Sequence, residues 1–182
     1  MYNYDVQVLP RSREWIRELA TLVREVTVAT RGEFGPRFPI VEALEEVMPE
    51  LDTAFVYEIL DKHEMGENHG LTLPSEHLIQ IRLDVYEGAC AGNGRDRMTV
   101  AHEIGHYLMH DTPRFARNTK NTRVPAYCNP EWQADCFGGE LLVFPEGLSA
   151  DMTAEQVAKL RGVSLDAARI QLTVLRNGGI IR

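Results

Sequence analysis

The 182-residue chain contains little cysteine, and its apolar residues never form a long run. Its three cysteines (Cys90, Cys128 and Cys136) include no C-x-x-C pair, which excludes a disulfide scaffold and predicts reduced thiols. No apolar stretch approaches the roughly 20 residues of a membrane-spanning helix. Residues 1–5 also lack the basic and apolar regions of a signal peptide. We therefore expect a cytoplasmic protein whose main domain is large enough to bury a core.

Basic residues are fewer than acidic ones, 19 against 27, and the formal net charge is −8 at pH 7. The imbalance is concentrated in residues 40–69, the acidic region, where Lys62 is opposed by nine acids: Glu42, Glu45, Glu46, Glu50, Asp52, Glu58, Asp61, Glu64 and Glu67. This balance argues against direct binding of nucleic acid. We interpret the acidic region as a solubilising face. The alternative is a docking surface for a basic, DNA-binding protein.

A metal-binding pattern is present at His102-Glu103-Ile104-Gly105-His106. Two histidines four residues apart share one face of a helix, where their imidazole nitrogens can bind the same ion. Apolar periodicity over residues 97–110, with Asp96 as N-cap, predicts that helix. Glu103 would then act on metal-bound water as general base. A structural pair of buried histidines is the alternative, but it leaves Glu103 unexplained.

A second predicted helix offers the third ligand. Asn129 suits the N-cap and Pro130 the first helical position. Glu131 and Asp135 follow on one face of this helix. We predict that Glu131 binds the metal and that Asp135 accepts the free ring N–H of a histidine. Two alternatives stay open: Asp135 as the ligand itself, and a merely solvated acidic face.

These motifs, within residues 99–110 and 131–142, resemble the ImmA/IrrE family of zinc metallopeptidases. In that family a HExxH helix precedes an ExxxD-like helix that ends in an apolar LL-x-P run, and residues 141–145 are similar to that ending. The resemblance covers roughly residues 78–145. It implies a cytoplasmic, gluzincin-like zinc enzyme that cleaves a helix-turn-helix repressor. Gly138-Gly139 departs from the alanines common there and predicts looser helix packing.

Periodicity elsewhere predicts an α+β, zincin-like fold. Helices are expected at residues 12–29, with Ser12 as N-cap, and at residues 40–47. Strands are expected at residues 53–61, 70–73 and 78–86, forming a small antiparallel sheet before the metal helix. We predict that residues 78–86 form the sheet edge that pairs with an extended substrate.

The C-terminal residues read as a helix, a short turn and a second helix. Thr153 and Gln156 form a capping box, Gly162 ends the first helix and Ser164 caps the second. This spacing is also that of DNA-reading motifs, but five basic and three acidic residues in 151–182 leave a charge of only +2. We interpret residues 151–182 as a helical appendage packed on a metallopeptidase domain formed by residues 1–150.

The segment between the two site helices, residues 111–128, is predicted to be a loop. Its basic residues recur every third position (Arg114, Arg117, Lys120 and Arg123) and either are solvated or line the substrate groove. His110 is interpreted as a packing or supporting histidine. Tyr107, Tyr127 and His110 are candidates to stabilise an oxyanion, and the sequence does not choose among them.

The patterns together predict a zinc-dependent endopeptidase. His102, His106 and Glu131 would bind zinc, Glu103 would be the general base, and Asp135 would orient a histidine. Two alternatives remain: a catalytically silent regulator that uses the zinc fold to bind a repressor, and a zinc hydrolase acting on a small amide. The intact Glu103 argues against the silent regulator, because metal binding alone does not require it.

Overall fold

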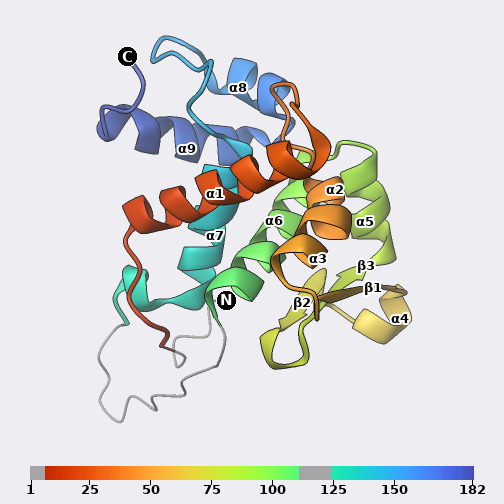
Figure 1. The fold of residues 1–182 in the computed structure, drawn as a ribbon. Helices are drawn as coiled ribbons and strands as arrows, with labels where there is room; N and C mark the ends of the chain where they lie inside the picture. Colours follow the sequence, from red (N-terminus) through yellow and green to blue (C-terminus); the bar gives the residue numbers. More distant parts are fainter. Residues whose placement is uncertain (1–6, 111–123) are drawn as a thin grey trace.

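The computed structural model describes residues 7–110 and 124–182 and has a mixed α+β fold (Figure 1). In chain order the elements are α1 (Arg13–Arg31), α2 (Ile40–Glu42), the π-helical turn η1 (Ala43–Val47), α3 (Met48–Leu51), β1 (Val56–Leu60), α4 (Lys62–Met65), β2 (Gly70–Leu73), the 3-10 turn η2 (Pro74–Glu76), β3 (Leu78–Arg82), α5 (Leu83–Cys90), α6 (Gly94–Met109), the 3-10 turn η3 (Ala126–Cys128), α7 (Pro130–Leu142), α8 (Ala154–Arg161) and α9 (Leu165–Asn177). Figure 1 shows the sheet on one side of the molecule and α8 and α9 on the other, with α6 and α7 between them.

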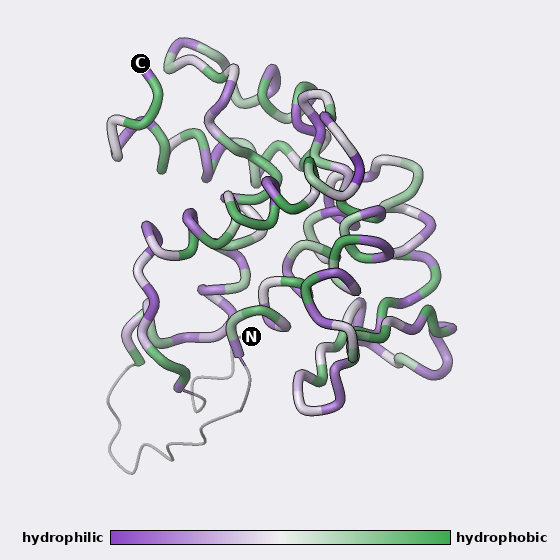
Figure 2. The backbone as a smooth tube through the Cα atoms, viewed as in Figure 1, coloured by the Kyte–Doolittle hydropathy of each residue, from purple (hydrophilic) through white to green (hydrophobic). Residues whose placement is uncertain are grey.

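Helix α1 begins where the sequence predicts. The hydroxyl of Ser12 accepts a hydrogen bond from the Trp15 backbone at 3.1 Å, which satisfies an N–H that the helix cannot. Apolar and polar residues alternate along α1 (Figure 2), and the apolar face, including Ile16 and Val23, is buried. The helix packs against α7. Helix α1 therefore supports α7, one of the two helices that provide the predicted site residues.

The sheet corrects one prediction. Its strand order is β1-β3-β2; β2 pairs with β3 antiparallel, whereas β1 pairs with β3 parallel. The expected sheet was antiparallel throughout. The short η2 connection forces β2 and β3 to run in opposite directions. Between β1 and β3 the chain passes through α4 and β2, so that pair is free to be parallel.

The predicted substrate edge at residues 78–86 is also wrong. Strand β3 covers only Leu78–Arg82 and is paired on both sides, so it is the centre of the sheet. From Leu83 the chain is helical, as α5. The alternating apolar residues suggested a longer strand, but Val85 and Ala89 are buried four residues apart, which is the spacing of a helix face.

Helices α6 and α7 pack closely. Helix α6 starts at Gly94 with Asn93 as N-cap, so the predicted cap Asp96 lies instead in the first turn. A Cβ atom added at Gly105 would lie 3.0 Å from the Phe137 ring, and one at Gly138 would lie 2.7 Å from the Met98 sulfur. Gly105 of α6 and Gly138 of α7 thus permit close approach of the two helices, contrary to the looser packing expected.

The C-terminal helices have the predicted caps. Thr153 and Gln156 form the capping box, Gly162 is left-handed at φ 65°, and Ser164 caps α9. Leu172 of α9 is buried in the core that also contains residues of α1 and α6. These contacts support a scaffold role for α8 and α9, while a boundary at residue 150 stays a prediction. No helix in the described part of the chain is both long and apolar enough to cross a lipid bilayer.

Candidate metal centre

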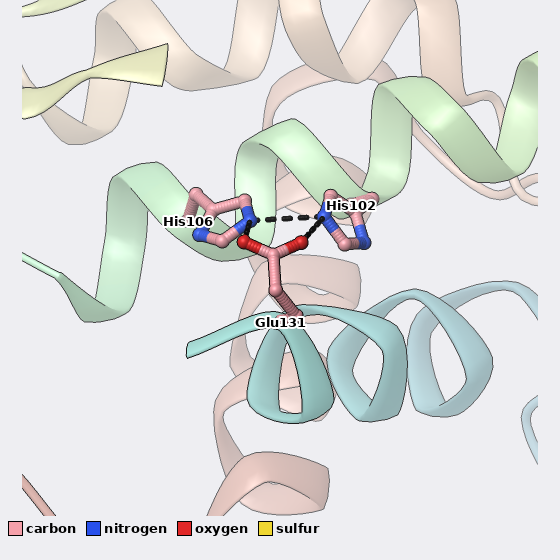
Figure 3. A group of neighbouring side chains, drawn as sticks. All are labelled: His102, His106 and Glu131. Carbon is pink, nitrogen blue, oxygen red and sulfur yellow. Dashed lines mark hydrogen bonds and ion pairs between the residues drawn. The ribbon is translucent and has the colours of Figure 1, made fainter. Parts of the chain in front are cut away.

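His102 and His106 extend from α6 towards Glu131 on α7 (Figure 3). The Glu131 carboxylate oxygens lie 3.3 Å from His102 Nε2 and 3.5 Å from His106 Nε2. The two Nε2 atoms are 2.9 Å apart. These residues form a group whose potential ligand atoms all lie within 4.8 Å of one another. The structure therefore brings together the three ligands predicted from the sequence.

The donor set fits a divalent cation. Two imidazole nitrogens and one carboxylate are a ligand set typical of catalytic zinc. Two nitrogens 2.9 Å apart cannot both present lone pairs unless a proton or a cation lies between them. A hydrogen bond from His102 is the largest cause that holds the pKa of Glu131 well below its usual range. Burial opposes a charge on His102, yet hydrogen bonds to Asp135 and Glu131 raise its pKa to about 10. Positive charge is thus favoured at this position.

Asp135 lies on the other edge of the His102 ring. Its Oδ1 is 2.9 Å from Nδ1, whereas Glu131 approaches Nε2. An N–H at Nδ1 donating to Asp135 leaves Nε2 free to bind a metal. This arrangement favours a supporting role for Asp135 over direct ligation.

Glu103 is buried beside strand β2. Thr72 donates a hydrogen bond of 2.6 Å from its hydroxyl to the Glu103 carboxylate. Gly70, on the same strand, leaves room for that carboxylate, because an added Cβ would lie 2.5 Å from Glu103 Cγ. Neither Gly70 nor Thr72 was predicted as a site residue, because no local sequence pattern connects β2 with a residue of α6.

A cleft of about 450 Å³ gives access to the centre. It is lined by β2, α6 and the start of α7, and Glu103 and both histidines face it. The edge strand, the proposed base and the ligand group therefore meet in one cavity.

His110 supports His106. Its Nδ1 lies 2.9 Å from His106 Nδ1, and its Nε2 lies 3.1 Å from Gln133 Oε1. Burial is the largest cause that lowers the pKa of His110, to about 4. The supporting role expected for His110 agrees with these contacts. Gln133 was not predicted as a site residue, because His110 and Leu9, two of its partners, are distant along the chain.

The sequence model of the IrrE N-terminal-like domain, Peptidase M78, matches residues 63–173. The chain belongs to this peptidase family. The match includes both site helices and most of α9, and it confirms the resemblance found in the sequence. Membership indicates a metallopeptidase-type activity on a protein substrate. A search of curated proteins found no significant match.

The oxyanion candidates differ in position within this Peptidase M78 domain. The hydroxyl of Tyr107 donates to Asp52 at 2.6 Å, and Tyr107 is not among the residues lining the cleft. Tyr127 is exposed. His110 lines the cleft, but both ring nitrogens have hydrogen-bonding partners. The four basic residues expected to be solvated or to line a groove lie within residues 111–123, outside the described residues.

At least five of the nine acids of the acidic region contact other residues of the protein. Contacts with other residues are made by Glu45 (with Tyr86), Glu46 (with Arg31), Asp52 (with Tyr107), Glu58 (with Gln80) and Glu64 (with the Asp61 backbone). Glu64 belongs to the capping box of α4, and Glu46, Glu58 and Glu64 are exposed. Docking of a basic partner on the acidic region therefore stays a prediction.

Proposed function

We propose that this protein is a zinc-dependent endopeptidase in which His102, His106 and Glu131 bind the metal. One observation supports this proposal: the Glu131 carboxylate lies 3.3 Å from His102 Nε2 and 3.5 Å from His106 Nε2, in a cleft that Glu103 also faces. Bound zinc would polarise the scissile carbonyl and acidify water at the site.

Three residues of the chain have the remaining roles in proton transfer and in orienting the site. Glu103 accepts a proton from the attacking water and later delivers it to the leaving amine. The hydrogen bond from Thr72 holds the Glu103 carboxylate in place. Asp135 keeps the N–H of His102 at Nδ1.

We infer that the substrate binds as an extended strand along β2. This strand is at an edge of the sheet, and Gly70, Leu71 and Thr72 line the cleft beside Glu103. An exposed strand edge offers backbone groups to an extended peptide without demanding a particular sequence. The family resemblance supports a helix-turn-helix repressor as the substrate and the cytoplasm as the compartment; both are parts of the proposal.

Metal analysis tests the ligand assignment. Purified wild-type protein should carry about one zinc per chain, because three protein ligands suffice to hold it. Glu131→Ala should lose the metal, whereas Asp135→Ala should retain it with lower affinity. Zinc unchanged in Glu131→Ala but lost in Asp135→Ala would show that Asp135 is the ligand.

The variant Glu103→Gln separates an enzyme from a silent regulator. It keeps the side-chain shape and removes the base, so zinc content should be unchanged while cleavage is lost. Cleavage is measured by mass spectrometry after incubation with a proteome-derived peptide library and with candidate repressors. The same variant can retain uncut substrate for identification. Wild-type protein that carries zinc and binds a repressor, but cuts no probe, would favour the silent regulator.

A further inference from the structure

A chain of hydrogen bonds runs from the metal site through the buried side chain of Gln133 to two backbone carbonyls. Its amide nitrogen lies 2.9 Å from the carbonyl oxygen of Leu9 and 2.7 Å from that of Tyr127. Backbone carbonyls can only accept, so both N–H groups of the amide are committed to them. The orientation of the amide is thereby settled, and Oε1 faces His110.

The next link follows from the chemistry of the amide oxygen. Oε1 of Gln133 can only accept, so His110 must donate from Nε2 across the 3.1 Å between them. A neutral imidazole carries one hydrogen. With that hydrogen on Nε2, Nδ1 of His110 is an acceptor.

The last link reaches a proposed ligand. Nδ1 of His106 lies 2.9 Å from Nδ1 of His110, and one of the two must donate. Because His110 presents a lone pair, His106 donates. Its hydrogen is then held at Nδ1, and Nε2, which faces Glu131 (Figure 3), is left without one. This tautomer is the one that binds a metal through Nε2.

We propose that Gln133 and His110 are positioning residues that fix the tautomer and orientation of His106 for metal binding. The proposal rests on His106 being a ligand, as stated under the proposed function. It also shows how the two histidines differ: a carboxylate orients His102, whereas a neutral chain anchored on two backbone carbonyls orients His106. Helix α7 supplies both a ligand, Glu131, and the anchor of this chain.

The tautomers can be read directly in the wild-type protein. Long-range 1H–15N correlation spectra of the zinc-loaded protein distinguish a hydrogen on Nδ1 from one on Nε2. We expect His106 to carry it on Nδ1 and His110 on Nε2. A hydrogen on Nδ1 of His110 would overturn the proposal even with zinc bound. Absence of zinc binding would instead overturn the proposed function and, with it, the role of this chain.

Variants measure the contribution to affinity, by competition for zinc with a chromophoric chelator. Gln133→Met and His110→Phe preserve approximate volume but remove the hydrogen bonds, and supporting residues of this kind contribute about 10- to 100-fold in metal affinity. His110→Asn places an acceptor near the lost Nδ1 and should recover part of the loss. The buried Cys136, also on α7, provides the control Cys136→Ala, which should bind zinc as the wild type does.

Circular dichroism establishes that each variant is folded. The expected loss of zinc affinity is about 10- to 100-fold. If folded Gln133→Met and His110→Phe bind zinc within about twofold of the wild type, Gln133 and His110 only fill space in the fold. If either variant fails to fold, the histidine tautomers measured by NMR in the wild-type protein decide whether the proposal holds.

Discussion

Replacing Gly70 by alanine tests whether β2 positions the proposed base. The added Cβ would lie 2.5 Å from Glu103 Cγ and 2.8 Å from both Cδ and Oε1, whereas ordinary contacts begin at 3.4 Å. Relief of the closest contact requires a movement of about 0.9 Å, the difference between 3.4 and 2.5 Å. Strand β2 is held by β3, so the Glu103 side chain is the part more able to move.

The expected loss follows from that displacement. Misplacing a catalytic group by about 1 Å can reduce the rate about 100-fold, which corresponds to roughly 2.7 kcal/mol in the barrier. Overpacking should lower the free energy of unfolding by about 1–3 kcal/mol. Zinc content should stay the same, because the proposed ligands are on α6 and α7 and none is on β2.

The assay combines cleavage of a peptide cut by the wild type with zinc analysis and urea unfolding. Gly35→Ala is the matched control, because nothing lies within 4 Å of its added Cβ. A folded, zinc-loaded Gly70→Ala that cleaves within about threefold of the wild type, instead of the predicted 100-fold loss, would refute the positioning argument.

Three further predictions concern other contacts. Thr72→Val removes the 2.6 Å hydrogen bond to the Glu103 carboxylate, so it should lower kcat about tenfold and leave the zinc content unchanged. Thr72→Ser keeps the hydroxyl and should restore kcat. Equal kcat values for the two variants would contradict this prediction. Burial raises the pKa of Cys136 to about 12, so iodoacetamide at pH 8 should label exposed Cys90 in the folded protein but Cys136 only after unfolding, as peptide mass spectrometry can show. A hydrogen bond from Tyr107 is the main cause that lowers the pKa of Asp52 from 3.8 to about 2. The stabilisation of the fold by ionised Asp52 is therefore present above pH 4 and is lost as the pH falls towards 2. The difference in unfolding free energy between wild type and Asp52→Asn should therefore shrink from pH 5 to pH 2, and a constant difference would argue against this linkage.

The sequence alone determined the features that depend on local spacing. His102 and His106 share a face because a helix brings residues four apart together, and the same geometry fixes Glu131 relative to Asp135. Helix starts at Ser12 and the other predicted caps were also local, because a cap bonds to the backbone two or three residues away. Asp96 was misplaced as a cap because Asn93, three residues earlier, can serve equally well.

Tertiary structure decided everything that depends on contacts between distant segments. The alternation of apolar residues after Arg82 favoured a strand, but the chain is helical there and buries Val85 and Ala89 on one face of α5. Pairing of β3 on both sides leaves β1 and β2 as the two edges of the sheet. Strand β2 packs on α6, which places Thr72 against Glu103, 31 residues later. Hydrogen bonds and strand pairs of this kind join atoms that approach only after the chain has folded. They therefore cannot be predicted from the periodicity of the sequence.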